Sequence, residues 1–190
     1  MKKVSVYLLL FLSICSFQGV AQSASGEQFG STLNLGIGIG GNSGYSRYAG
    51  QSLPVFLINY EFDVARDFTL APFISFYTYN NSYNWGDKNN PNRNYNYREL
   101  VIPVGLKGTY YFDRLLNASS KWDFYLAGSL GFAIVSRRWD NGYYGDKKYF
   151  NNNSGLYLEL HVGTEYHFND RIGMFLDLST GVSSIGLAIH

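Results

Sequence analysis

The sequence predicts an all-β fold, an up-and-down barrel of eight antiparallel strands. Apolar residues alternate with small or polar residues along most of the chain, and this period of two is typical of strands with two different faces. The segments that connect these alternating runs are alternately long and short. Beyond the first residues, no apolar run approaches the length of a transmembrane helix. A chain of this kind could cross a bilayer only with strands that close into a barrel.

The first 21 residues differ from the rest of the chain. Two lysines precede an apolar stretch, and small residues occupy the −3 and −1 positions before Gln22. This pattern predicts that residues 1–21 form a cleaved signal peptide and that residues 22–190 form one exported domain. Cys15 offers the alternative of a lipid-modified cysteine, but Ile14 before it lacks the small side chain of such sites.

The composition excludes several classes of function. Cys15 is the one cysteine of the chain, so the predicted mature protein has no disulfide, thiolate nucleophile or cysteine-based metal site. Lys and Arg total 15 and Asp and Glu total 14, for a formal net charge of +1. This balance does not indicate a nucleic-acid partner. Without disulfides, a small exported domain must be stabilised in another way, and closure of a barrel in lipid is one such way.

The eight expected strands follow from the alternation. They cover residues 30–40, 53–64, 68–79, 98–112, 122–136, 155–168, 172–181 and 184–190. The fourth, fifth and sixth show the pattern best, because each has a nearly uninterrupted apolar face. On the fourth strand this face consists of Leu100, Ile102, Val104, Leu106, Tyr110 and Phe112. On the fifth it consists of Phe124, Leu126, Leu130, Phe132 and Ile134, and on the sixth of Leu156, Leu158, Leu160, Val162, Tyr166 and Phe168.

We expect the apolar face to point outward, toward lipid. A soluble lipocalin-type barrel also alternates, with its apolar face inside. The other face here is rich in Gly, Ala, Ser and Thr, which suits the narrow interior of an eight-stranded barrel. The central strands are long enough to cross a bilayer. Aromatic residues gather beside the short connections, as in an interfacial girdle. They are Tyr60, Phe62, Phe68, Tyr110, Phe112, Trp122, Phe124, Tyr166 and Phe168.

The connections predict the orientation of the barrel. Long loops are expected at residues 41–52, 80–97 and 137–154. Short connections are expected at residues 65–67, 113–121 and 169–171, and the last outer connection, near residues 182–183, is also short. Long outer loops and short periplasmic turns are typical of outer-membrane barrels. With both termini periplasmic, the number of strands is even.

These motifs resemble the small outer-membrane β-barrel domain family, the porin-like relatives of OmpA, OmpX and OmpW. The resemblance rests on Val101–Phe112, Trp122–Gly128 and His161–Gly173 and covers roughly residues 29–190. It implies an eight-stranded transmembrane barrel in the outer membrane of a Gram-negative cell envelope, but no activity. The chain departs from the family by ending in Ile189-His190 rather than in an aromatic residue. Pro72 and Pro103 lie inside expected strands, so we expect a local bulge there.

Charged residues on the inward face are the first candidate site. We expect a lumen charge network made of Glu61, Glu99, Lys107, Asp123, Glu159, His161, Glu165 and Asp177. Such groups pair with one another to fill the interior, and the alternative is a narrow path that favours cations. Glu159 and His161 could orient an imidazole, but no serine or threonine is clearly placed beside them and a third metal ligand is missing. We therefore expect no catalytic residue, no metal site, no cofactor and no enzyme activity.

The long loops are the second candidate site, because they combine aromatic rings with more bases than acids. The expected contact residues are Trp85, Arg93, Arg137, Arg138, Trp139, Tyr143 and Tyr144. Rings and cations of this kind can bind lipopolysaccharide headgroups, extracellular glycans or proteins, and the alternative is that the loops only lie among anionic lipid sugars. The sequence therefore predicts a non-enzymatic outer-membrane barrel with a structural or surface-binding role and with membrane lipid and lipopolysaccharide as partners. A narrow channel for small solutes and a soluble periplasmic lipocalin-like binder are the alternatives.

Overall fold

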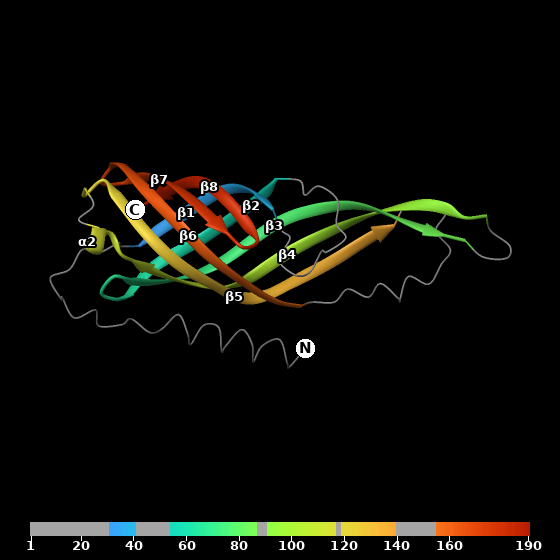
Figure 1. The fold of residues 1–190 in the computed structure, drawn as a ribbon, viewed down its shortest axis with the longest axis horizontal. Coiled ribbons are helices and arrows are strands. Elements are labelled where there is room, and N and C mark those ends of the chain that lie inside the picture. The colour runs from blue at the N-terminus through green and yellow to red at the C-terminus, as the bar shows by residue number, and fades with distance from the viewer. Residues whose placement is uncertain (1–30, 41–53, 87–90, 117–118, 140–154) are drawn as a thin grey trace, which may run out of the picture.

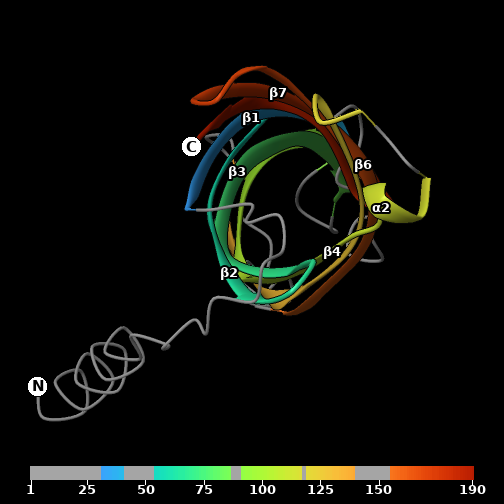
Figure 2. The ribbon, with the colours of Figure 1, turned by 90° about the vertical axis from the view of Figure 1, so that its left-hand side faces the viewer.

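The chain folds into a closed barrel of eight antiparallel strands that pair in chain order, as the alternation predicts. The computed structural model describes residues 31–40, 54–86, 91–116, 119–139 and 155–190. The predicted signal peptide, the loops at residues 41–53 and 140–154, and therefore Tyr143 and Tyr144, lie outside the described residues. Seen from one end, the strands form a ring with a single helical turn outside it (Figure 2).

Each expected strand corresponds to one strand of the structure. The elements are β1 (Thr32–Gly40), β2 (Val55–Ala65), β3 (Phe68–Trp85), β4 (Arg93–Tyr111), α2 (Asp113–Leu116), β5 (Trp122–Trp139), β6 (Gly155–Asn169), β7 (Ile172–Ser179) and β8 (Val182–Ile189). In the described part of the chain, no helix is long and apolar enough to cross a membrane.

The barrel closes between its first and last strands. β8 pairs with β1 from Leu33 opposite Ile189 to Gly40 opposite Val182. The 8 residues of β8 therefore meet nearly the whole of β1. Both ends of the described chain lie at the end of the barrel that carries the short turns and α2 (Figure 1).

The apolar face points outward. Leu158 is 60% exposed, whereas its neighbour Glu159 is 2% exposed. The same contrast repeats around the barrel, because the interior of an eight-stranded barrel accepts few large side chains. A lipocalin-like binder would instead enclose a ligand with its apolar face. The outward apolar face is the arrangement that the sequence predicts, and it does not fit the alternative of a lipocalin-like binder.

Three strands continue well beyond the rest of the barrel (Figure 1). β3 and β4 pair as far as Trp85 opposite Arg93, and β4 pairs with β5 as far as Tyr97 opposite Trp139. We call residues 77–85, 93–101 and 134–139 the protruding sheet. The prediction of loops over residues 80–97 and 137–154 is therefore wrong at residues 80–85, 93–97 and 137–139.

Cross-strand pairing explains why this asparagine-rich segment forms strands. Tyr83 lies directly opposite Tyr95, and Asn84 Nδ2 donates a hydrogen bond of 2.8 Å to Asn94 Oδ1. Aromatic pairs of this kind stabilise antiparallel strands. The segment appears loop-like in sequence because its second face is polar, but its period of two is intact.

The two prolines lie within paired strands, and the pairing register is the same on both sides of each proline. Pro72 pairs with Leu106 on β4, and Pro103 pairs with Ala133 on β5. The registers of β3 with β4 and of β4 with β5 stay constant past both residues, so the expected bulge is absent there. The register shift of this region lies between Asp63 and Ala65, beside the β2–β3 turn. A proline without an N–H can break single hydrogen bonds and still leave the register unchanged.

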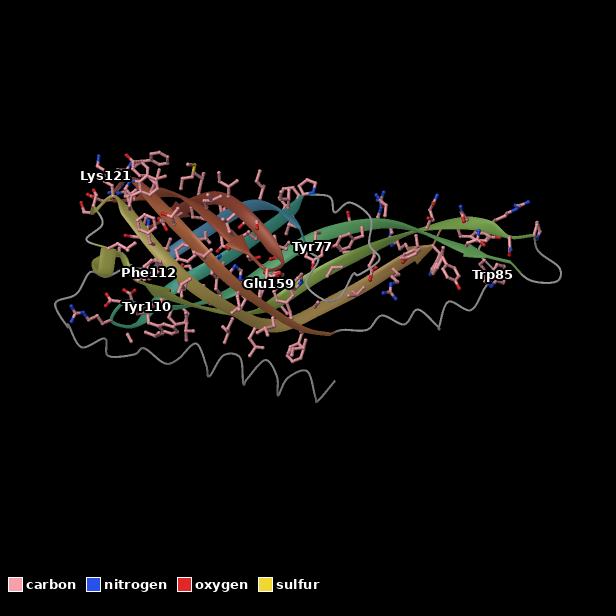
Figure 3. All side chains as sticks on the ribbon, in the orientation of Figure 1. Tyr77, Trp85, Tyr110, Phe112, Lys121 and Glu159 are labelled. Carbon is pink, nitrogen blue, oxygen red and sulfur yellow. The ribbon has the colours of Figure 1, made fainter. Side chains whose placement is uncertain are left out.

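The aromatic side chains beside the short turns contact one another on the outside of the barrel. The Trp122 ring lies 4.8 Å from the Tyr166 ring, and the Tyr166 ring lies 5.4 Å from the Phe168 ring. Tyr110 and Phe112 mark the same end in Figure 3. Such a ring belt is typical of the interface between lipid and water.

Candidate functional site

Apolar side chains fill the end of the lumen that lies opposite the short turns, together with the base of the protruding sheet. This plug consists of Val55, Tyr77, Tyr79, Val101, Ala133, Val135, Tyr157 and Val182. Tyr77 lies where the protruding sheet leaves the barrel (Figure 3). A conducting barrel needs a continuous water path, and these side chains occupy the lumen in the described part of the chain. The structure therefore gives the narrow-channel alternative no support.

A buried polar network lies in the middle of the barrel. Lys107 Nζ is 2.6 Å from Asp177 Oδ2, and the Tyr125 hydroxyl donates to the same oxygen at 3.0 Å. The other oxygen of Asp177 accepts a hydrogen bond from His161 Nδ1 at 2.7 Å. His161 Nε2 lies 2.8 Å from Ser129 Oγ. These five residues from β4, β5, β6 and β7 form the central network.

In the central network, a serine hydroxyl contacts an imidazole, and the imidazole in turn contacts a carboxylate. This order matches a nucleophile, its base and the group that orients the base. The expectation that no serine stands beside His161 is therefore wrong. The β5–β6 register pairs Ser129 with Glu159 and Ala127 with His161, which brings Ser129 within reach of the imidazole.

The space around this serine is small. A cavity of about 40 Å³ lies between Ser129, His161 and Phe175. That volume holds a few water molecules at most, whereas sites for organic ligands occupy several hundred cubic ångströms. Asp177 is also held by Lys107 and Tyr125. The arrangement can fix a proton between Ser129 and His161, but it offers no room for an acyl substrate.

The eight residues predicted as one lumen network all lie on the inward face of their strands, but the structure divides them. Lys107, His161 and Asp177 belong to the central network. Glu159 borders the same cavity and packs against Gly181, where an added Cβ would overlap its carboxylate. Figure 3 shows Glu159 in the middle of the barrel.

Glu61 lies closer to the short-turn end. Its carboxylate accepts hydrogen bonds from Thr69, from the Tyr111 hydroxyl at 2.8 Å and from Asn34 Nδ2 at 3.2 Å. These neutral donors satisfy a buried carboxylate without a cation. Asp123 and Glu165 lie at the mouth of the same end, where their partners are histidines.

Glu99 lies at the base of the protruding sheet and pairs with a residue predicted as a loop contact. Arg137 Nη2 is 2.8 Å from Glu99 Oε1, and Arg137 Nε donates to the same oxygen at 3.1 Å. The two residues lie directly opposite each other on β4 and β5. The guanidinium of Arg137 is therefore engaged within the protein, whereas Arg93 and Arg138 are exposed.

One face of the protruding sheet is aromatic. The Trp139 ring lies 4.7 Å from the Tyr97 ring and 6.2 Å from the Tyr83 ring. The Trp85 and Tyr95 rings are 6.1 Å apart. These residues continue the inward face of β3, β4 and β5 beyond the barrel, and Trp85 lies near the far end of the hairpin (Figure 3). The structure thus brings Trp139 together with Tyr97 and Tyr83, which belong to a different predicted loop.

The other face of the protruding sheet is polar. Arg98 lies directly opposite Arg138, and Arg98 Nε donates a hydrogen bond of 3.2 Å to Asn80 Oδ1. The same face is apolar inside the barrel, up to Phe76 on β3, and at the base of the protruding sheet, where Leu100 and Ile134 lie. The outward surface therefore changes from apolar to cationic and polar where the strands leave the barrel.

The fold is shared with solved outer-membrane barrels, although no known protein family and no curated protein matches this sequence significantly. The outer membrane protein OprG of Pseudomonas aeruginosa matches 86% of this chain over 97% of its own, with a TM-score of 0.53 and 9% identity. Neisserial surface protein A matches 84% of this chain over 95% of its own, with a TM-score of 0.50 and 14% identity. At this level of identity, the likeness shows the fold of a transmembrane β-barrel.

Proposed function

We propose, from the fold that this chain shares with small outer-membrane β-barrels, that it is an integral outer-membrane protein that binds anionic glycans through its protruding sheet. Lipopolysaccharide of the outer leaflet is the nearest such glycan. Short turns on the periplasmic side are typical of such barrels, and together with the signal peptide predicted for residues 1–21 they support a periplasmic location of both ends of the mature chain. In that orientation the protruding sheet faces the cell exterior.

The outward apolar belt supports residence in a membrane. On β5 it extends from Phe124 to Ile134, about the length that a strand tilted by roughly 45° needs to cross a bilayer. The aromatic belt marks one boundary and Arg98 with Arg138 marks the other. In water, so large an exposed apolar surface would cause aggregation.

The observation that carries the binding proposal is the change of polarity on both faces where β3, β4 and β5 leave the barrel. The lipid-facing side becomes rich in arginine and asparagine, and the lumen-facing side becomes aromatic. Like charges directly opposite on neighbouring strands destabilise a sheet. An anion between Arg98 and Arg138 would relieve that repulsion through charge-assisted hydrogen bonds.

The position of these groups fits a glycan of the outer leaflet. Arg98 and Arg138 follow directly on the apolar belt, at the level where the phosphates of lipopolysaccharide lie above the acyl chains. On the other face, the rings of Trp139, Tyr97 and Tyr83 offer apolar surfaces with polar edges, which suit the packing of sugar rings.

The test is binding of lipopolysaccharide core oligosaccharide to the purified barrel in lipid nanodiscs. Trp139→Ala should weaken binding at least tenfold, because Trp139 contacts both neighbouring rings and truncation of such an anchor costs more than about 1.4 kcal/mol. Trp122→Ala is the matched control, since it removes the same side chain at the opposite end of the barrel. An unchanged affinity for Trp139→Ala, or an equal loss for Trp122→Ala, would contradict the proposal.

We also infer that the chain is not an enzyme, despite the aligned Ser129, His161 and Asp177. The cavity beside Ser129 is too small for an ester or amide substrate. A fluorophosphonate probe should therefore leave the folded protein unlabelled. Labelling that maps to Ser129 and disappears in Ser129→Ala would show instead that this serine is a reachable nucleophile.

A further inference from the structure

A second group of side chains lies at the mouth of the barrel beside the short turns. Glu165 and His167 on β6 and His190, which follows β8, each direct one ligand atom to a common point, and all three atoms lie within 4.8 Å of one another. We propose that these residues bind a divalent transition-metal ion such as Zn²⁺. This proposal is independent of the surface-binding function.

The distances suit a tetrahedral ion after small movements. His190 Nε2 lies 2.8 Å from Glu165 Oε1, and His167 Nδ1 lies 3.9 Å from the same oxygen. Zinc bonds of about 2.0–2.1 Å in a tetrahedron place ligand atoms roughly 3.3 Å apart. The first distance must therefore lengthen and the second shorten, each by about half an ångström. The nitrogen atoms that the two histidines offer lie within 4.8 Å of each other, so they must approach by up to roughly 1.5 Å. Side-chain rotations provide movements of this size.

Each imidazole is anchored through its second nitrogen. His167 Nε2 lies 2.7 Å from Asp123 Oδ2, and its Nδ1 lies on the side of Glu165. In the neutral imidazole that donates from Nε2 to Asp123, Nδ1 carries the lone pair that a metal ion requires. His190 Nδ1 lies 2.9 Å from Thr32 Oγ1. In metal sites, a carboxylate or hydroxyl on the distal nitrogen fixes the tautomer and orients the ring. Asp123 and Thr32 occupy those positions here.

The pairing of β6, β7 and β8, together with the small size of Gly173, brings the three proposed ligand residues close to one another. Glu165 and His167 are two residues apart on β6 and so share its inward face. β7 lies between β6 and β8, and an added Cβ at Gly173 would overlap the Glu165 carboxylate. Because Gly173 has no side chain, Glu165 reaches over β7 to His190. A hydrogen bond of 3.0 Å from the His190 N–H to the Arg171 carbonyl holds that residue in place.

The charge of this mouth favours a cation. In the described part of the chain, the carboxylates of Asp123 and Glu165 form ion pairs only with His167 and His190. A dication would neutralise both carboxylates when the imidazoles are neutral. When the ion binds, it takes the place of the proton that His190 Nε2 and Glu165 Oε1 share. That proton is released to solvent.

The donor set selects the kind of ion. Two imidazoles and one carboxylate suit Zn²⁺, Ni²⁺ or Cu²⁺, whereas Ca²⁺ and Mg²⁺ prefer oxygen ligands alone. The side chains of His167 and His190 are 22% and 18% exposed, so an ion and a completing water can enter from solvent. A bound ion would link β6 to β8 and, through Thr32, to β1 at the closing seam.

The test is a Zn²⁺ titration of the tag-free mature barrel in detergent at neutral pH, read by competition with a chromophoric chelator. We expect one ion per barrel. His167→Gln and His190→Gln should each weaken binding at least tenfold, and Asp123→Asn should weaken it about 10- to 100-fold through loss of the orienting carboxylate. His161→Gln, which changes the one other histidine beyond the predicted signal peptide, is the matched control and should bind as the parent does.

A second measurement avoids variants altogether. Carbethoxylation of the parent protein, mapped by mass spectrometry, should be slowed by Zn²⁺ at His167 and His190 and be unaffected at His161. The proposal is overturned if the parent protein binds no stoichiometric Zn²⁺, if His167→Gln and His190→Gln retain its affinity, or if Zn²⁺ protects none of the mouth histidines.

Discussion

Replacing Lys107 by methionine should lower the free energy of unfolding by about 3–5 kcal/mol. Lys107 Nζ contacts Asp177 Oδ2 at 2.6 Å in the middle of the barrel, where the Asp177 side chain is 4% exposed and that of Lys107 is 12% exposed. Removing one partner of a buried ion pair leaves the other charge without compensation, and that desolvated charge is the main source of the loss. Tyr125 and His161 would still donate hydrogen bonds to Asp177, but neither supplies a permanent positive charge.

The measurement is urea unfolding of the barrel in lipid vesicles, followed by tryptophan fluorescence and by the gel mobility of unheated samples. Lys121→Met is the matched control, because Lys121 lies exposed in the turn before β5 and should change stability by less than about 0.5 kcal/mol.

A double variant separates the effect of the unpaired charge from the effect of the changed side-chain packing. Adding Asp177→Asn to Lys107→Met removes the unpaired charge while retaining hydrogen-bonding groups, so part of the lost stability should return. If Lys107→Met unfolds at the same urea concentration as the parent, the ion pair does not stabilise the barrel.

The second large effect is expected from Gly131→Ala, which should cost about 3 kcal/mol or more. Gly131 lies directly opposite Gly105 on the inward side of the β4–β5 ladder. An added Cβ at Gly131 would overlap the Val104 carbonyl oxygen and lie 2.7 Å from the Gly105 Cα. Both obstacles are backbone atoms, so no side-chain rotation can relieve the overlap, and the two strands must separate.

Gly128→Ala provides a control on the same strand. An added Cβ at Gly128 would meet its nearest neighbours only at 4.0 Å, which is ordinary van der Waals contact. The two variants should therefore differ clearly in their urea midpoints and in the fraction of protein that migrates as a folded barrel. Equal midpoints would show that the β4–β5 wall can widen at little cost.

The strands could be predicted because each residue in a barrel wall faces one of two contrasting environments. On β5, Leu126, Leu130 and Phe132 face outward and Ala127, Ser129 and Gly131 face inward, and the sequence alternates accordingly. The same signal did not predict the strands at residues 80–85 and 93–97. There both faces carry polar groups, and only the pairing of aromatic side chains across β3, β4 and β5 shows that the strands continue.

The sequence by itself determined the number of strands, their order and the inward or outward direction of most side chains, since these depend on local alternation and on connection lengths. The tertiary structure alone decided which inward groups meet. Ser129, His161 and Asp177 come from three strands, and Thr32 meets His190 across the seam where the barrel closes. Such contacts depend on the register between strands, which the closure of the whole barrel sets and which no local spacing along the chain encodes.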